Sequence, residues 1–496
     1  MKIYVLLFMA FLMVSCKSIT KAENNIEKPN IVFIYTDDQT YETIRALGNS
    51  EIQTPNMDKL VNEGTTFTTA FNMGGWGGAV CVASRAMMMS GAHVWRAKAQ
   101  EDLWMKNDSV AINRTWAKLM SKNGYNTYMT GKWHVKIKAN SVFDTVAHVR
   151  GGMPQYARKY REGTEKKKEI YKLGYNRPLN KKDTLWSPTD PKFEGFWKGG
   201  KHWSEVVKDD ALSFISDASK KEAPFFMYLA FNAPHDPRQA PQEFLDMYPL
   251  DNIAVPESFL PEYPYKDSIG NGSTLRDEAL APFPRTPYAV KKHRQEYYAL
   301  ITHLDQQIGE ILIGLEASGK KDNTYIFFTS DHGLAVGQHG LIGKQSLFDH
   351  SMRVPLMVVG PDIPKGKRLD QEVYLQDIMA TSLEIAGIEK PSYVEYHSLL
   401  DFIKDDKKQS NYDAIYGCYR EHQRMIRKDG YKLLVYPKIE KILLFDLTKD
   451  PEEITDLAEN PEQSERVKVL FKELLKLQND MDDSLDLTGL YNKLTT

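Results

Sequence analysis

Cys81 and Arg85 are the first residues whose type and spacing could carry out chemistry. They follow a glycine-rich stretch, Gly74–Gly78, and precede three methionines, Met87–Met89. If a helix begins near Val80, Cys81 lies in its first turn and Arg85 lies on the same face one turn later. Glycines let a ligand approach the backbone, and a helix N-terminus attracts anions. The pattern predicts a nucleophile beside a guanidinium at an anion site; the alternative is a core cysteine packed beside the methionines.

Four predicted strands end in charged or polar side chains that could act together. The runs Asn30–Thr36, Phe225–Phe231 and Thr324–Thr329 are typical of buried strands, and Asn126–Thr130 is a shorter strand candidate. Taken singly, the polar residues after them could be helix caps, turn residues or solvated lysines. Parallel strands, however, place their carboxyl ends at one edge of a sheet, where the sites of α/β proteins gather. We therefore expect one rim to hold Asp37, Asp38, Lys132, His134, His235, Asp331 and His332.

Helical patterns separate these strands and complete the expected fold. They cover Thr115–Asn123, Ser204–Ser219 and Glu296–Ser318. Strands alternating with helices predict an α/β fold, in which a large and mostly parallel sheet is flanked by helices on both faces. A proline-rich stretch at 234–288 predicts extended loops over the rim.

The last part of the chain predicts a smaller α+β domain with an antiparallel sheet. Short strand patterns at 414–416, 424–427, 431–436 and 443–447 precede an amphipathic helix at 464–481. Asp429 and Gly430 mark a tight turn between the second and third of these strands. We place the large domain at 29–400, after a linker at 17–28, and the small domain at 401–496.

Residues 1–16 resemble an export signal. Lys2 is followed by the apolar run Ile3–Val14, which is too short to span a bilayer, and then by Ser15 and Cys16. Cysteine directly after a small residue is typical of a bacterial lipoprotein, in which Cys16 would carry lipid; a plain cleaved signal is the alternative. We expect an exported bacterial protein, in the periplasm or anchored at the outer membrane, that meets the membrane only through Cys16.

Composition and cysteine content narrow the possible partners. The 64 basic and 66 acidic residues give a net charge of −2, so no attraction to nucleic acid is expected. Beyond Cys16, only Cys81 and Cys418 remain, which is too few for a disulfide framework. Cys418 is predicted to be a core residue.

Several motifs in the same order resemble those of type I sulfatases, which belong to the alkaline-phosphatase-like superfamily. The segment "CVASR" at Cys81–Arg85 resembles their activation motif, with Ala83 where proline is commoner, and "NIVFIYTDDQ" is similar to their first metal motif. Further similar segments are Thr54–Leu60, Gly131–His134, "NAPHDP", "TSDHGLAVGQHGLIGK" and Met352–Leu356. The resemblance covers nearly all of the mature chain and extends to bacterial polysaccharide sulfatases.

This resemblance implies a modified nucleophile and a bound metal. Cys81 would be converted to formylglycine by a maturing enzyme, and a hydroxyl of the formylglycine hydrate would attack the sulfur of a sulfate ester. The family implies one divalent cation, most often Ca²⁺, held by Asp37, Asp38, residue 81, Asp331 and His332. Oxygen donors favour a hard cation, and the single imidazole leaves other metals open.

The resemblance also implies a role for each remaining rim residue. Arg85 would orient the hydrate, and Lys132 and Lys344 would bind the sulfate. His235 and Lys344 would protonate the departing alcohol, and His134 would take a proton from the second hydroxyl as sulfate leaves.

The implied activity is hydrolysis of sulfate esters on a sulfated polysaccharide or oligosaccharide, with algal polymers such as ulvan or carrageenan slightly preferred. A basic and aromatic insertion at about 156–182 could bind such a polymer, or could be a solvated loop. Two alternatives stay open: a phosphodiesterase or phosphonate monoester hydrolase on the same scaffold, and a non-catalytic lipoprotein that binds sulfated glycans.

Overall fold

The chain folds around a mixed nine-stranded sheet. The computed structural model describes residues 28–152, 174–196 and 198–495, so the predicted export signal and most of the basic insertion lie outside the described residues. The strand order is β10-β2-β8-β7-β1-β6-β4-β5, with β9 beside β2, and only β8 runs against its neighbours. The strands are β1 (Asn30–Asp37), β2 (Thr65–Phe71), β4 (Asn126–Lys132), β5 (Thr145–Arg150), β6 (Phe225–Pro234), β7 (Thr324–Ser330), β8 (Arg353–Val359), β9 (Lys367–Leu369) and β10 (Val373–Tyr374).

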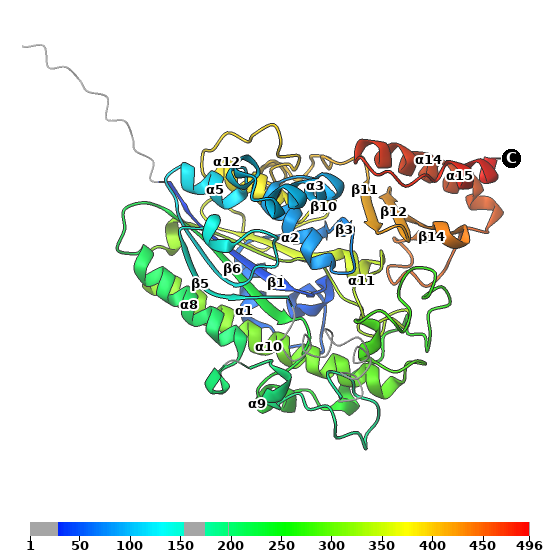
Figure 1. Cartoon of the computed structure of the whole chain (residues 1–496), viewed down its shortest axis with the longest axis horizontal. Coiled ribbons are helices and arrows are strands. Elements are labelled where there is room, and N and C mark those ends of the chain that lie inside the picture. Colours follow the sequence, from blue (N-terminus) through cyan, green and yellow to red (C-terminus); the bar gives the residue numbers. More distant parts are fainter. Residues whose placement is uncertain (1–27, 153–173, 197, 496) are drawn as a thin grey trace, which may run out of the picture.

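Helices cover both faces of this sheet, and alternate residues of the central strand β1 face opposite sides (Figure 1). Val32 and Ile34 pack with helices α1 (Pro55–Glu63), α8 (Trp203–Ala218), α9 (Gln242–Asp246) and α10 (Pro287–Ala317). Ile31, Phe33 and Tyr35 pack on the other face with α2 (Val80–Ser90), α3 (Val94–Met105), α5 (Trp116–Lys122) and α12 (Asp377–Ile385). The predicted mostly parallel sheet between two helical layers is therefore confirmed. Short helices α4 (Ser109–Asn113), α11 (Asp349–Met352) and α13 (Leu400–Lys404) complete this part of the chain.

The four strands predicted to end at the rim all form. They correspond to β1, β4, β6 and β7, each extended at its carboxyl end by one to three residues. Helix α10 begins at Pro287 instead of Glu296, because Thr286 caps it by accepting the Ala289 amide and because proline suits the first helical turn. The proline-rich stretch is mostly loop, as expected, but includes the short helix α9.

A second, five-stranded sheet forms near the C-terminus, in the order β14-β13-β12-β11-β3. Strands β11 (Ile415–Tyr419), β12 (Gln423–Lys428), β13 (Tyr431–Tyr436) and β14 (Lys441–Asp446) are antiparallel, and helices α14 (Ser464–Asp480) and α15 (Thr488–Thr495) follow them at one end of the molecule (Figure 1). The turn at Asp429–Gly430 has positive φ at both residues, as the sequence predicts. The boundary expected at residue 401 lies within α13.

The fifth strand of this sheet comes from the other end of the chain. Strand β3 (Gly74–Gly75) lies shortly before Cys81 and pairs in parallel with Cys418 and Tyr419 of β11. Gly74 has φ of 80°, and a Cβ there would lie 1.9 Å from the Cys418 carbonyl oxygen, so only glycine fits. The C-terminal sheet thus fixes the loop that leads into α2.

Candidate active site

Cys81 lies in the first turn of α2, as predicted, and is almost completely buried. Its Sγ atom lies 3.2 Å from Nδ1 of His134, which follows β4. Burial alone would raise the pKa of the thiol, but Lys132, His134 and Lys344 outweigh burial and hold the pKa well below its ordinary value. Residue 81 therefore occupies a position where a negatively charged or strongly polarised atom is stabilised.

The ends of β1 and β7 bring the predicted metal ligands together. The two strands are paired with Thr36 opposite Ser330, so the residues that follow them meet at the same edge of the sheet. Asp37, Cys81, Asp331 and His332 each offer a ligand atom, and these four atoms lie within 4.8 Å of one another. A second group with the same separation contains Asp37, Asp38 and His235.

Two buried atoms of this cluster lack a hydrogen-bond partner among the described residues: Oδ1 of Asp37 and Nε2 of His332. His332 donates from Nδ1 to the Gly333 carbonyl at 2.9 Å, which directs Nε2 towards the carboxylates, 3.5 Å from Oδ1 of Asp331. Burial would lower the pKa of His332, but Asp331, Cys81 and Asp38 raise it to about 9. Unpaired buried ligand atoms beside three carboxylates fit a divalent cation coordinated mainly by oxygen.

Three buried cations surround this cluster. Lys132 contacts Asp37, and Nζ of Lys344 lies 2.7 and 3.0 Å from the two Asp38 oxygens. Arg85 donates from Nε to Asp331 at 3.0 Å and from Nη1 to the Lys132 carbonyl at 2.9 Å. Arg85 thereby connects helix α2 to β4 and β7, which fixes the position of residue 81 relative to the carboxylates.

His235 lies beside Asp38 at the edge of the cluster. His235 donates from Nδ1 to the Asp236 carbonyl at 2.8 Å, and its Nε2 lies 4.0 Å from Asp38. Burial lowers the pKa of His235, but Asp38 and Asp236 more than compensate, so the net shift is upward. Such an imidazole is suited to donate a proton.

All ten predicted catalytic or metal-ligating residues therefore meet at one site. The sequence analysis missed several residues that support them. Asp236 and Asp277 are bridged by Arg276, Asn72 donates to the Asp331 carbonyl at 2.6 Å, and Gln345 donates to the Gly78 carbonyl at 2.8 Å. Of these residues, Asp236 and Gln345 carried a signal, because they directly follow the predicted His235 and Lys344. Cys418 is fully buried, and burial raises the pKa of its thiol to about 12, as expected for a core residue.

A buried nucleophile position among carboxylates, imidazoles and lysines defines a hydrolase of anionic esters with an alkaline-phosphatase-like fold. Residues 29–388 match the Sulfatase family, and residues 337–480 match the family described as N-sulphoglucosamine sulphohydrolase, C-terminal. An arylsulfatase of Clostridium perfringens is 31% identical over 488 residues, covering 90% of this chain and 94% of that protein. The chain belongs to the sulfatase family and is a sulfuric ester hydrolase, which excludes the non-catalytic alternative.

Other similar proteins are more distant. An ulvan-active sulfatase of Formosa agariphila is 26% identical, over 97% of this chain and 85% of that protein. A solved structure in complex with its substrate D-glucosamine-2-N,6-O-disulfate has a TM-score of 0.68 at 21% identity, covering 93% of this chain and all of that one (100%). The phosphonate monoester hydrolase of Agrobacterium radiobacter has a TM-score of 0.67 at 19% identity, covering 91% of this chain and 96% of the other. At these identities, the two structures share the fold alone.

Proposed function

We propose that this sulfatase releases sulfate from a sulfated polysaccharide or oligosaccharide, using a formylglycine made from Cys81 and one bound divalent cation, most simply Ca²⁺. The observation that carries the proposal is the placement of the residue 81 side chain within 4.8 Å of ligand atoms from Asp37, Asp331 and His332. The Sγ atom occupies the position that a hydroxyl of the formylglycine hydrate would take.

The proposed metal ligands are Asp37, Asp38, residue 81, Asp331 and His332. The cation would lower the pKa of the nucleophilic hydroxyl and neutralise sulfate charge. The described residues prepare this site: Asp37 and His332 present unpaired buried donor atoms, and Arg85 fixes Asp331 against helix α2.

Lysines and histidines would handle charge and protons. Lys132 and Lys344 are buried and can bind sulfate oxygens as soon as substrate competes with Asp37 and Asp38 for them. His235, held by Asp236, would protonate the departing alcohol together with Lys344. His134, 3.2 Å from residue 81, would remove a proton from that residue to release sulfate.

Peptide mass analysis of active enzyme tests this mechanism directly. We expect residue 81 to carry formylglycine, and we expect Cys81→Ala to lose sulfate release while the matched variant Cys418→Ala retains it. An unmodified thiol in fully active enzyme would refute the formylglycine assignment. The rival reaction is tested by comparing 4-nitrophenyl sulfate with 4-nitrophenyl phosphate and a phosphonate monoester, since faster turnover of a phosphorus ester would favour the alternative.

The carbohydrate substrate is supported by the ulvan-active relative and by the sulfated glucosamine bound in the structural neighbour. Algal polymers such as ulvan and carrageenan are our first candidates. A screen of defined sulfated oligosaccharides, scored by released sulfate, tests the assignment. Hydrolysis of aryl sulfates alone would contradict a carbohydrate substrate.

We also propose that the protein is exported and carries lipid on Cys16, and that a maturing enzyme modifies Cys81. Residues 1–27 lie outside the described residues. Of the helices that the structure does describe, none combines the length and apolar character needed to span a bilayer. Fractionation of cells that express the wild type and Cys16→Ala tests the anchor, since loss of the lipid would move the protein from membranes to the periplasm.

A further inference from the structure

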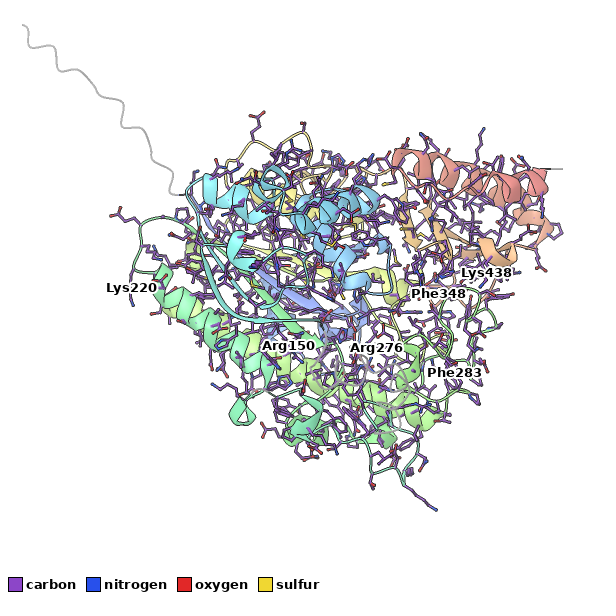
Figure 2. The ribbon with its side chains drawn as sticks, in the orientation of Figure 1. Arg150, Lys220, Arg276, Phe283, Phe348 and Lys438 are labelled. Atoms are coloured by element: carbon purple, nitrogen blue, oxygen red, sulfur yellow. The ribbon has the colours of Figure 1, made fainter. Side chains whose placement is uncertain are left out.

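A small cavity, open to the surface, lies beside His235, on the side of the site away from the C-terminal sheet. Its lining includes Arg150 from the end of β5, Asn232 from β6 and Trp203 from the start of α8. In Figure 2, Arg150 lies near the middle of the molecule, away from α14 and α15. The cavity is not needed for any of the roles assigned above to the rim residues.

Arg150 has no carboxylate within 4.0 Å among the described residues, whereas the buried guanidiniums of Arg85, Arg285 and Arg424 are each paired with an aspartate or glutamate. The Nη2 atom of Arg150 donates to the Glu194 carbonyl at 3.2 Å, and its guanidinium lies 4.8 Å from the Trp203 ring centre. Burial lowers the pKa of Arg150 to about 10, because Tyr175 and Asp37 compensate only in part. A half-buried cation with no carboxylate in direct contact can attract an anion.

Asn232 supplies a second polar group. It is 9% exposed, and its Oδ1 atom is buried without a hydrogen-bond partner among the described residues. Its main-chain carbonyl accepts from the His235 amide at 2.9 Å, which fixes Asn232 next to the proposed proton donor. An unpaired acceptor in a cavity favours a ligand that brings a hydroxyl or an N–H group.

Strand pairing places Arg150 beside a residue of the proposed sulfate site. Arg150 lies opposite Lys132 in the β4–β5 register, and the Trp133 amide donates to the Arg150 carbonyl at 3.3 Å. A group bound by Arg150 would therefore belong to the same sugar, or its neighbour, as the sulfate held by Lys132.

We propose that Arg150 and Asn232 form a subsite for a second anionic substituent of the substrate, a sulfate or a carboxylate, next to a hydroxyl or N–H group. Arg150 binds the anion, and Asn232 accepts the adjacent hydrogen. This subsite rests on the proposed carbohydrate function and narrows it to sugars with more than one negative charge.

The test compares Arg150→Met, Arg150→Lys and the wild type on substrates that differ in charge. Methionine keeps an apolar stem against Trp203 while removing the charge. Arg466→Met is the matched control, because Arg466 also lies over an aromatic ring, at 3.7 Å from Tyr431, on a distant helix. The substrates are glucosamine-2-N,6-O-disulfate, a 6-sulfated disaccharide that contains a uronate, N-acetylglucosamine 6-sulfate, and 4-nitrophenyl sulfate.

We expect Arg150→Met to lower kcat/KM about 10- to 100-fold, mainly through KM, on whichever dianionic sugar is recognised. Activity on 4-nitrophenyl sulfate should stay within about twofold of the wild type, and Arg150→Lys should restore part of the loss. The uronate and N-sulfate arms distinguish a carboxylate from a sulfate. For sugars that are not hydrolysed, their inhibition of aryl sulfate hydrolysis provides the binding measurement.

The subsite would be overturned if Arg150→Met lost activity equally on all four substrates, or if dianionic sugars bound this variant as tightly as they bind the wild type. Either result would leave the sulfatase assignment intact. If none of the sugars is hydrolysed or inhibits while 4-nitrophenyl sulfate is cleaved, the carbohydrate assignment fails together with the subsite.

Discussion

Gly152 determines where the His134 ring can lie, and replacing it with alanine should reveal how finely that ring must be placed. A Cβ built on Gly152 would lie 2.3 Å from Cε1, 2.6 Å from Nε2 and 2.7 Å from Nδ1 of His134. Ordinary contact begins near 3.4 Å, so the ring or the end of β5 must move by about 1.1 Å (3.4 minus 2.3). A shift of that size disrupts the 3.2 Å contact between Nδ1 and residue 81.

A displacement of about 1 Å in a reacting group can cost about 100-fold in rate. We therefore expect Gly152→Ala to lower kcat for 4-nitrophenyl sulfate by about that factor, with a smaller change in KM. Because the loss acts through His134, the double variant Gly152→Ala/His134→Ala should be no slower than His134→Ala alone.

The assay is steady-state sulfate release by the wild type, both single variants and the double variant, with thermal unfolding of each recorded in parallel. Gly489→Ala is the control, since a Cβ at Gly489 meets nothing within 4 Å. Its activity should match that of the wild type. Losses that multiply in the double variant, or a Gly152→Ala enzyme that keeps more than about a third of wild-type kcat, would refute the positioning role.

Three further predictions follow from buried groups. Burial raises the pKa of Glu296 to about 7 from 4.5, so the folded state binds the extra proton and the unfolding free energy falls as pH rises from about 4.5 to 7. Glu296→Gln should remove that fall, so the variant should be more stable than the wild type by up to about 3 kcal/mol at pH 8 but not at pH 4. Urea unfolding measures both values, and equal stability of the two proteins at pH 8 would contradict the prediction. Removal of divalent cations with EDTA should abolish activity. Added Ca²⁺ should raise the melting temperature of the wild type but not that of Asp37→Asn. If the substitution leaves the Ca²⁺ response unchanged, Asp37 is not a ligand. Gly74→Ala should lose at least about 1–3 kcal/mol of stability, because alanine is strained at φ of 80° and meets the Cys418 carbonyl; unaltered denaturant unfolding would show that β3 adapts freely.

The central strands and the rim residues could be predicted because β1, β6 and β7 are largely apolar runs followed by charged residues, and the shorter β4 also leads into charged residues. The part of the large sheet formed by β2 and β8 could not be predicted in this way. Strand β8 contains Pro355, which cannot donate to a ladder, and the register of β2 shifts between Phe67 and Ala70 opposite this proline. Its sequence therefore does not resemble a strand, although tertiary packing makes it one.

The groups that support the rim were hidden for a different reason. Arg276 comes from a long loop whose path has no periodicity, and the contact of Gly152 with His134 depends on where β5 ends. A sequence pattern identifies residues that line up along one element. It carries no information about a guanidinium or a glycine brought in from a separate loop.

The pairing of β3 with β11 links the order of synthesis to the availability of Cys81. Gly74 and Cys418 are 344 positions apart (418 minus 74), so the strand before the nucleophile has no partner until most of the polypeptide has emerged. Native contacts between such distant segments form late, because a long loop must close first. Any enzyme that modifies Cys81 therefore has a long interval during synthesis in which its target is still open, and that interval ends when the C-terminal sheet forms.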